Sequence, residues 1–304
     1  MDGHPGVSVH RGDVCRPDTL VEPMRGVDVV FHLAGIHGLW RPASVYYDVN
    51  VRGTENVCRA ALAAGSRLVH VSTWAVYGIG RGRVLDETQP LNPFPDNYTV
   101  SKAQADELVQ RLITEEGLPA VIVRPGIMLG PGDRVNFARM ANRLLAGRAI
   151  IIGSGHNHVV FVYVEDVVEG LILAAVRQEA LGQVYNLSTD RPFTQSELWR
   201  AIADEIGSPP PRVHIPYRAL RLAAYISEAL VSSENPRGQP LITRFGVELF
   251  GTDNLVSSEK AQRELGYLPR VDLREGVRRA ARWYLRDKGA YGCASKPEAQ
   301  ALRY

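Results

Sequence analysis

Residues 27–34 have the sequence Val-Asp-Val-Val-Phe-His-Leu-Ala, a short run of β-branched and apolar side chains that ends in small residues. Residues 67–72 (RLVHVS) and 120–124 (AVIVR) repeat this pattern further along the chain. Such runs are typical of buried parallel strands. Between them, residues 43–64 and 98–117 have apolar positions at helical spacing. This alternation of strand and helix predicts a doubly wound α/β sheet.

The pattern changes after residues 130–133, whose sequence Gly-Pro-Gly-Asp is typical of a turn. Beyond them the chain is expected to be mainly helical, with one strand–helix unit at residues 159–177. Near the N-terminus, residues 7–14 are expected to form one more strand. The helices expected in the later region are 134–147, 194–206, 218–232 and 272–286.

These patterns divide the chain into two expected parts. Residues 1–130 and 159–190 form the part that contains the sheet, and residues 131–158 and 191–287 form a smaller, mainly helical cap. Residues 288–304 are polar and have little to bury, so we expect a disordered tail there.

Composition and charge exclude several classes of protein. The 304 residues carry a formal net charge of only +2 and no dense run of Lys or Arg, which argues against nucleic acid or an anionic membrane as partner. The N-terminus lacks the order of a signal peptide, and no apolar run approaches the roughly 18 residues of a membrane span. Cys15, Cys58 and Cys293 are widely spaced, which predicts neither a disulfide framework nor a zinc site. We expect a soluble protein of the reducing cytoplasm, with no metal and a small-molecule substrate.

The strongest chemical motif is Tyr98-Thr99-Val100-Ser101-Lys102, at the start of an expected helix. Positions i and i+4 share one helix face, so the phenol of Tyr98 and the ammonium of Lys102 would lie side by side. A cation near a phenol lowers its pKa from about 10 toward working pH, as a general acid or base requires. Spacing alone favours an ordinary surface helix, so the context decides.

That context is the segment at residues 71–78 (VSTWAVYG). In it, Ser72 and Thr73 follow an expected central strand. Ligands bind at the carboxyl ends of the strands in open α/β sheets, so these two hydroxyls would face the crevice in which Tyr98 lies.

Several further motifs occur in a fixed order along the chain. Together with Tyr98 and Lys102 they resemble the extended short-chain dehydrogenase/reductase family over residues 7–286, which is nearly the whole chain. This resemblance implies a Rossmann-like sheet that binds a dinucleotide and a cap that holds the substrate. The motifs are Gly12-Asp13-Val14, His32-Leu33-Ala34-Gly35, Asn50-Val51-Arg52-Gly53-Thr54, Ser72-Thr73, Arg124-Pro125 and Val164-Glu165-Asp166-Val167.

The resemblance implies a catalytic set of three residues. Tyr98 would transfer the proton, and Thr73 would bond the substrate oxygen, with Ser72 as the alternative to Thr73. Lys102 would bridge the ribose hydroxyls of the cofactor and tune the phenol. The hydride would pass between a substrate carbon and NAD or NADP.

The same resemblance implies further contacts to the cofactor. Asp13 and Val14 match the pair that contacts adenine in relatives. Leu33-Ala34-Gly35 matches the turn beneath the phosphates and ribose, and Asn50 matches an asparagine near the nicotinamide ribose. Pro125 to Ile127 match the segment beside the carboxamide. Ser72, Tyr98 and Lys102 would also border the cofactor.

One part of the family pattern is missing from this sequence. Relatives have a first strand and a glycine-rich turn against the pyrophosphate, some tens of residues ahead of the position that matches Val7. We therefore expect an N-terminally incomplete sheet, through an internal start within a longer gene product, a degenerate short form, or replacement by another segment. The region where relatives choose between NAD and NADP is missing as well, so both cofactors stay open.

Two enzymatic branches and one non-catalytic role stay open within the family. Residues 212–217 and 257–261, with residues 265–269, are similar to the 3β-hydroxysteroid dehydrogenase-like branch, which favours an oxidoreductase acting on a carbinol or ketone. The alternatives are a nucleotide-sugar epimerase or dehydratase and a nucleotide-binding relative without turnover. Relatives also suggest a homodimer through the helices that carry Tyr98. The cap arginines that could hold the diphosphate of a nucleotide sugar are Arg134, Arg139, Arg143, Arg244 and Arg270.

Two histidine positions have two interpretations each. His37 lies just beyond the Ala34-Gly35 turn and either reaches substrate or cofactor or is an ordinary loop residue. His156-Asn157-His158 suggests a metal by composition, but no third ligand is placed nearby, so we expect a surface loop.

Overall fold

A computed structural model of the chain describes residues 4–38, 40–189, 191–231 and 238–291. Four parallel strands form its central sheet, in the order β1-β2-β4-β9. In register, His32 lies opposite His70 and Val71 lies opposite Val123. The Rossmann-like, doubly wound sheet expected from the sequence is confirmed. The strands are β1 (Val29–His32), β2 (Arg67–Val71), β4 (Ala120–Pro125) and β9 (Val184–Leu187).

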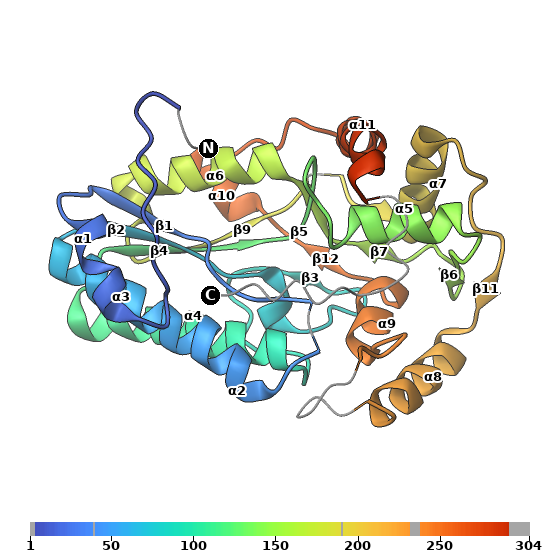
Figure 1. The fold of residues 1–304 in the computed structure, drawn as a ribbon, viewed down its shortest axis with the longest axis horizontal. Coiled ribbons are helices and arrows are strands. Elements are labelled where there is room, and N and C mark those ends of the chain that lie inside the picture. Colours follow the sequence, from blue (N-terminus) through green and yellow to red (C-terminus); the bar gives the residue numbers. More distant parts are fainter. Residues whose placement is uncertain (1–3, 39, 190, 232–237, 292–304) are drawn as a thin grey trace.

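Helices cover both faces of this sheet (Figure 1). Leu68 and Ile122 point to the face covered by α3 and α4. Val69 and Val123 point to the opposite face, which α6 and α10 cover. Alternate residues of a strand face opposite sides, so strands apolar at every position suit a sheet covered on both faces. The four helices are α3 (Gly53–Ala64), α4 (Asn97–Glu116), α6 (Val164–Val176) and α10 (Glu259–Leu265).

The strand expected at residues 7–14 is absent, and that prediction is wrong. Among the described residues, this segment pairs with no strand, and Val7 and Val9 are 49% and 60% exposed. A strand needs a neighbour for its backbone hydrogen bonds, and β1 forms the edge of the described sheet without pairing with this segment. The chain instead turns through η1 (Pro17–Thr19) and α1 (Val21–Met24) before it enters β1.

The expected cap helices are present near their predicted positions. A cluster around Phe137, Leu198 and Val277 joins α5, α7 and α11. A second cluster around Leu220 and Val247 joins α8 and α9. The boundaries expected between the sheet part and the cap stay predictions. The helices are α5 (Phe137–Leu145), α7 (Gln195–Ile206), α8 (Tyr217–Ala229), α9 (Arg244–Gly251) and α11 (Leu273–Tyr291).

Helix α11 continues to Tyr291, so the first residues of the tail expected at 288–304 are helical, contrary to prediction. No proline, the residue that most strongly ends a helix, occurs between Leu273 and Tyr291. The rest of that tail, residues 292–304, lies outside the described residues. None of the described helices is long and apolar enough to cross a membrane.

Four two-stranded sheets connect the cap segments with one another and with the central part. The β7–β10 pair is antiparallel and the other three are parallel. The pairs are β3 (Val84–Leu85) with β12 (Leu255–Val256), β5 (Ile127–Leu129) with β8 (Phe161–Tyr163), β6 (Ile151–Ile152) with β11 (His214–Ile215), and β7 (His158–Val159) with β10 (Phe193–Thr194).

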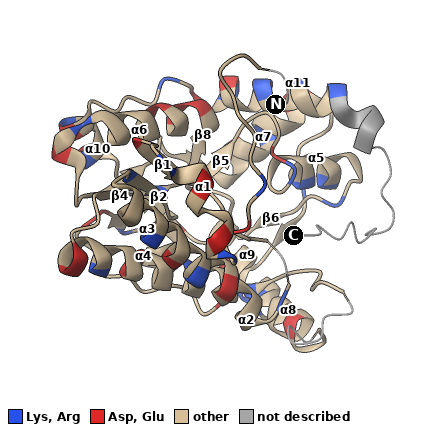
Figure 2. Ribbon diagram, turned by 60° about the vertical axis from the view of Figure 1, so that its left-hand side comes forward, with Lys and Arg blue, Asp and Glu red and all other residues tan. Residues whose placement is uncertain are grey.

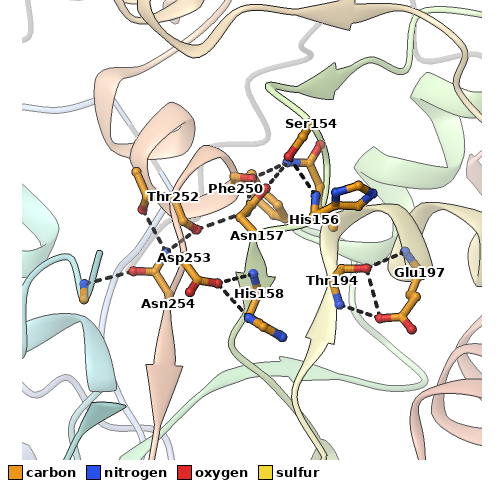
Figure 3. A network of polar contacts seen from close by, with 12 residues as sticks. Ser154, His156, Asn157, His158, Thr194, Glu197, Phe250, Thr252, Asp253 and Asn254 are labelled. Atoms are coloured by element: carbon orange, nitrogen blue, oxygen red, sulfur yellow. Dashed lines mark hydrogen bonds and ion pairs between the residues drawn. The ribbon is translucent and has the colours of Figure 1, made fainter. Parts of the chain in front are cut away.

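The loop after α9 is fixed to β7 by the polar network of Figure 3. Asp253 Oδ1 accepts hydrogen bonds from the backbone N of His158 and pairs with its ring Nδ1, both at 2.7 Å. Asn157 Nδ2 donates to the carbonyls of Phe250 and Thr252 at 2.9 and 3.0 Å. Residues 156–158 are therefore not a simple surface loop as expected, because two of the three hold the end of α9 in place.

A buried ion pair joins the sheet to α4. Arg124, near the end of β4, donates from Nε and its terminal nitrogen to both carboxylate oxygens of Asp106, at 2.9 and 2.7 Å. Its other terminal nitrogen donates to the hydroxyl of Tyr77 at 2.7 Å, and that hydroxyl donates to Asn186 Oδ1 on β9 at 2.9 Å. Arg124 and Asp106 are 2% and 0% exposed. Each buried charge thus depends on its partner.

We expect Asp106→Ala to lower the free energy of unfolding by about 3–5 kcal/mol, because it leaves the Arg124 guanidinium buried and unpaired. Glu107→Ala is the control, since Glu107 is the exposed neighbour on the same helix. Urea denaturation followed by circular dichroism measures both. Equal losses for the two variants would contradict the dependence of the fold on this pair.

Candidate functional site

The carboxyl end of β2 presents two hydroxyls. Thr73 begins η3 (Trp74–Tyr77), and its Oγ1 accepts a hydrogen bond from the backbone N of Ala75 at 3.3 Å. Ser72 is tied to the neighbouring strand, because its backbone N donates to the carbonyl of Val123 at 2.7 Å. The Ser72 hydroxyl is buried and has no partner among the described residues. A buried hydroxyl normally has a partner, so this atom marks a place where a further polar group fits.

Helix α4 begins beside these hydroxyls. Asp96 caps it, because its Oδ1 accepts from the backbone N of Tyr98 at 3.0 Å and of Thr99 at 3.1 Å. This cap places Tyr98 in the first turn, where its phenol is hydrogen-bonded to the Thr73 side chain. One turn later, Lys102 Nζ donates to the carbonyl of Val71 at 2.8 Å. The helix start is thus bonded to the end of β2 on both sides of Ser72.

Burial sets the protonation of this pair. It raises the pKa of Tyr98 to about 12, although the hydrogen bond with Thr73 acts in the opposite direction. Burial also lowers the pKa of Lys102 to about 8, against the opposing charge of Asp106. The expectation that Lys102 lowers the pKa of the phenol is wrong here, because loss of hydration dominates and the ammonium is bonded to Val71. At neutral pH, Tyr98 is a protonated phenol.

Asn50 supports the loop after β1 from within a π-helical turn, η2 (Tyr47–Arg52). Its Oδ1 accepts from the backbone N of Ile36 at 2.8 Å, and its Nδ2 donates to the Ile36 carbonyl and to Ser101 Oγ at 3.1 and 3.0 Å. Gly35 leaves the space for this contact, since a Cβ there would lie 3.1 Å from Asn50 Oδ1. All three bonds of the amide are made inside the protein, so Asn50 positions this loop and α4.

Two buried imidazoles lie between the sheet and these helices. The rings of His32 and His70 are 5.5 Å apart, and His32 Nε2 bonds Thr54 Oγ1 at 2.9 Å. The Thr54 hydroxyl donates to the carbonyl of Asn50 at 2.6 Å, so His32 Nε2 is the donor in their contact. His70 is 0% exposed, and neither ring nitrogen has a partner among the described residues. Burial and the charge of Lys102 lower the pKa of both imidazoles, to about 3 for His32.

The remaining sequence-predicted cofactor residues are spread along the same side of the molecule. Asp13 and Val14 are half-buried beside the start of α3, where Val14 packs on Gly53 and Asp13 Oδ1 accepts from the backbone N of Cys15 at 2.8 Å. Leu33, which follows β1, is 62% exposed. Ala34 and Gly35 after it are exposed as well.

A cavity of about 1300 Å³ opens between the strand ends and the cap. Five of the predicted residues meet at it. The Tyr98 ring is also in edge contact with His37, with centroids 6.1 Å apart, which supports a site position for that histidine. The cavity does not reach Asp13, Val14, Leu33, Ala34, Gly35, Asn50 or Lys102. The five predicted residues that line it are Ser72, Thr73, Tyr98, Pro125 and Ile127.

Most of the cavity wall beyond this reactive end is apolar. Its aromatic and aliphatic side chains come largely from the cap, on and around α5, α8 and α9. Phe94 and Phe245, with ring centroids 5.8 Å apart, form part of this wall. The arrangement suits a substrate whose polar group meets Thr73 and Tyr98 while its body lies in an apolar pocket. Further apolar lining residues are Met140, Ile150, Ile152, Leu220, Val247 and Phe250.

Comparison with known proteins is consistent with this geometry. A sequence model of the NAD dependent epimerase/dehydratase family matches residues 2–188. The chain belongs to this family. A 2-alkyl-3-oxoalkanoate reductase of Stenotrophomonas maltophilia is 32% identical, over 90% of this chain and 86% of that protein. A 3-beta-hydroxysteroid dehydrogenase of Mycolicibacterium neoaurum is 30% identical, over 88% of this chain and 77% of that protein.

A solved relative shares the fold. The dTDP-glucose 4,6-dehydratase DesIV of Streptomyces venezuelae, determined with NAD bound, superposes with a TM-score of 0.74 at 26% identity, covering 95% of this chain and 83% of that one. The expected resemblance is therefore confirmed at the level of the family, which consists of nicotinamide-dependent enzymes. The roles of individual residues stay predictions.

The family's nicotinamide cofactor fits the described strand ends. The unpartnered Ser72 hydroxyl and the exposed loop at residues 33–35 offer polar and backbone groups at neighbouring strand ends. Pro125 to Ile127 follow β4 at the same edge, where the backbone N of Gly126 donates to the carbonyl of Leu187 at 2.9 Å. Asn50 fits less well, because its amide is already fully bonded within the protein.

Sequence reasoning missed several residues that build the site. Asp106 lies four residues after Lys102 and therefore on the same helix face, a spacing that could have indicated a buried charge. His32 and His70 each occupy an apolar run, where a polar residue signals a buried contact. The bond between Asn50 and Ser101 leaves no trace in sequence spacing, because it joins two separate helical segments.

We expect His70→Leu to reduce the acid sensitivity of the fold. The folded-state pKa of His70 lies well below its usual 6.5. As the pH falls below 6.5, only the unfolded chain takes up a proton at this residue. The free energy of unfolding is therefore unaffected by His70 above pH 6.5 and decreases as the pH falls below it. The wild type should lose about 1.4 kcal/mol more per pH unit than His70→Leu below about pH 6. Urea denaturation at about pH 7.0, 6.0 and 5.5 measures this slope of the free energy of unfolding against pH.

The control for this comparison is His156→Leu, since His156 is exposed to solvent. That variant should follow the wild-type slope. If His70→Leu follows the wild-type slope too, His70 takes up a proton in the folded protein and the assignment of a neutral, unpaired imidazole is incorrect.

Proposed function

We propose that this protein is an NAD(P)-dependent oxidoreductase that interconverts a ketone and a carbinol on a substrate with a large apolar body. The observation that carries the proposal is the Tyr98 phenol, hydrogen-bonded to Thr73 where an apolar cavity meets the end of β2. A protonated phenol beside a hydroxyl is suited to a carbonyl oxygen that gains charge as the reaction proceeds.

In the direction of reduction, the substrate carbonyl oxygen lies between the hydroxyls of Thr73 and Tyr98. Thr73 donates a hydrogen bond to it, and Tyr98 transfers its Oη proton as charge develops on that oxygen. The nicotinamide, when bound, supplies the hydride to the carbonyl carbon. Lys102 fixes α4 to the Val71 carbonyl, so the phenol and Thr73 keep their separation. A substrate body bound on the apolar wall would displace water from this end of the cavity.

The raised pKa of Tyr98 favours reduction near neutral pH. Reduction needs the protonated phenol, which predominates at every pH well below about 12. Oxidation of the carbinol needs the phenolate, which is scarce at pH 7. The cytoplasmic location and the homodimer expected from the sequence stay predictions alongside this proposal.

We expect Tyr98→Phe to lower kcat for reduction of 2-dodecanone by about 10²–10⁴-fold, because proton transfer to the carbonyl oxygen is lost. Tyr47→Phe is the matched control, since Tyr47 is 47% exposed and lies outside the cavity lining. The change in nicotinamide absorbance measures both variants, and circular dichroism confirms that each is folded. A Tyr98→Phe variant as active as the control would rule out this mechanism.

The two directions of the reaction should differ in pH dependence. Oxidation of 2-dodecanol should rise about tenfold per pH unit between about pH 6.0 and 7.5, as the small phenolate fraction grows, while reduction stays nearly constant. Lys102, with a pKa of about 8, stays mostly protonated in this window. Initial rates of oxidation with NAD or NADP, and of reduction with NADH or NADPH, give the two profiles. An oxidation rate independent of pH, or turnover of a nucleotide sugar but of no ketone, would count against the proposal.

A further inference from the structure

One wall of the cavity is cationic rather than apolar. Helix α5 carries Arg139 and Arg143 one turn apart on its exposed side, and both side chains line the cavity. Figure 2 shows basic positions along α5 and no acidic position on it. Arg134, on the loop that enters α5, lines the same wall. Residues four apart on a helix share one face, so the two α5 guanidinium groups can act on one anion.

The carboxylates that line the cavity do not form ion pairs with Arg139 or Arg143. Asp96 is bonded to the backbone at the start of α4. Asp133 accepts from three backbone N–H groups at the start of α5, the closest at 2.8 Å. Glu228 is paired with Arg244, whose Nε lies 2.5 Å from its Oε2. Among the described residues, Arg139 and Arg143 have no carboxylate within ion-pair distance.

Arg139 lies near the reactive end of the cavity. Its charge is close enough to contribute to the lowered pKa of His37, after the larger effect of reduced hydration. The His37 ring in turn contacts the edge of Tyr98. The guanidinium of Arg139, the His37 ring and the phenol of Tyr98 therefore border the same cavity, together with apolar side chains on α8 and α9.

We propose that Arg139 and Arg143 bind a carboxylate of the substrate, which is then an oxo acid or hydroxy acid with a long alkyl or fused-ring body. A guanidinium matches a carboxylate in geometry and can bind it through two parallel hydrogen bonds. Arg139, Arg143 and Tyr98 all line this one cavity, so a single substrate can meet both the guanidinium groups and the phenol. This inference rests on the proposed function, because it specifies the substrate of the same site.

An apolar body fits the rest of the cavity better than a nucleotide sugar does. Cap side chains such as Leu220, Val247 and Phe245 line the cavity and offer no hydrogen bonds. The hydroxyls and base of a sugar nucleotide would lose their bonds to water there. A nucleoside diphosphate is therefore the competing ligand that a test must include.

The test compares dodecanoate with dodecanol as ligands of the full chain, followed by tryptophan fluorescence. Trp40, Trp74 and Trp199 line the cavity and report on binding independently of turnover. Wild type should bind dodecanoate more tightly than dodecanol. Arg139→Gln and Arg143→Gln should each raise the Kd of dodecanoate about tenfold or more, as expected for loss of a charge-assisted pair, and change that of dodecanol less than about twofold.

Arg148→Gln is the matched control, since Arg148 is exposed just beyond α5 and does not line the cavity. Its Kd for dodecanoate should equal that of the wild type. Equal losses for dodecanoate and dodecanol, or the same loss in Arg148→Gln, would overturn the carboxylate site. Binding of uridine diphosphate that depends on the α5 arginines, without binding of dodecanoate, would also overturn it, in favour of a diphosphate.

The two proposals can fail separately. Reduction of neutral 2-dodecanone by the wild type tests the reaction and does not involve a carboxylate. If the ketone is reduced but dodecanoate binds no better than dodecanol, the oxidoreductase stands and the acid-binding inference fails. If dodecanoate binds through Arg139 and Arg143 but no ketone or oxo acid such as 3-oxododecanoate is reduced, the site stands and the assigned reaction fails.

Discussion

The geometry of the site depends on the buried ion pair between Arg124 and Asp106. Arg124 is followed directly by Pro125 at the cavity, and Asp106 lies one helical turn after Lys102. The same guanidinium bonds Tyr77 at the end of η3, the turn that begins after Thr73. The strand, the helix and the turn that carry the reacting groups are therefore all positioned against one charge, and a buried charge tolerates little displacement from its partner.

The burial of the side chains at this site also determines the chemistry that they can perform. It raises the pKa of Tyr98 to about 12 and lowers that of Lys102 to about 8, because each neutral form is favoured when water is removed. The imidazoles of His32 and His70 are kept neutral in the same way. A phenol that stays protonated at neutral pH can donate its proton to a carbonyl but is scarcely available as a base for an alcohol, which is why the proposed mechanism favours reduction.

The sequence allowed the sheet and the start of α4 to be predicted, because both depend on local patterns. Apolar runs identified β1, β2 and β4, and the spacing of Tyr98 and Lys102 located the start of α4. The prediction of a strand at residues 7–14 failed because a strand needs a neighbouring strand for its backbone hydrogen bonds. A local sequence pattern does not show whether that neighbour is present. Strand β9 escaped notice because Asn186 interrupts its apolar run; the structure shows its Oδ1 accepting from Tyr77 and its backbone N donating to Glu87. The prediction that Lys102 lowers the pKa of Tyr98 failed for a similar reason, because the burial of the phenol depends on packing by segments that are distant in the sequence.

The walls of the cavity come from two different parts of the chain. The residues proposed to react therefore lie on one part, and most residues proposed to select the substrate lie on the other. Thr73, Tyr98 and Pro125 belong to elements fixed by the Arg124 pair, whereas the apolar and cationic walls belong largely to α5, α8 and α9. The cap is attached to the sheet part through the β3–β12 pair and through bonds such as the one that the backbone N of Gly80 donates to Asn254 Oδ1 at 3.0 Å. Substitutions on the cap face of the cavity can therefore change which body and which anion are accepted without moving the phenol from Thr73. A division of this kind lets one fold serve proteins as different as a 2-alkyl-3-oxoalkanoate reductase and a 3-beta-hydroxysteroid dehydrogenase.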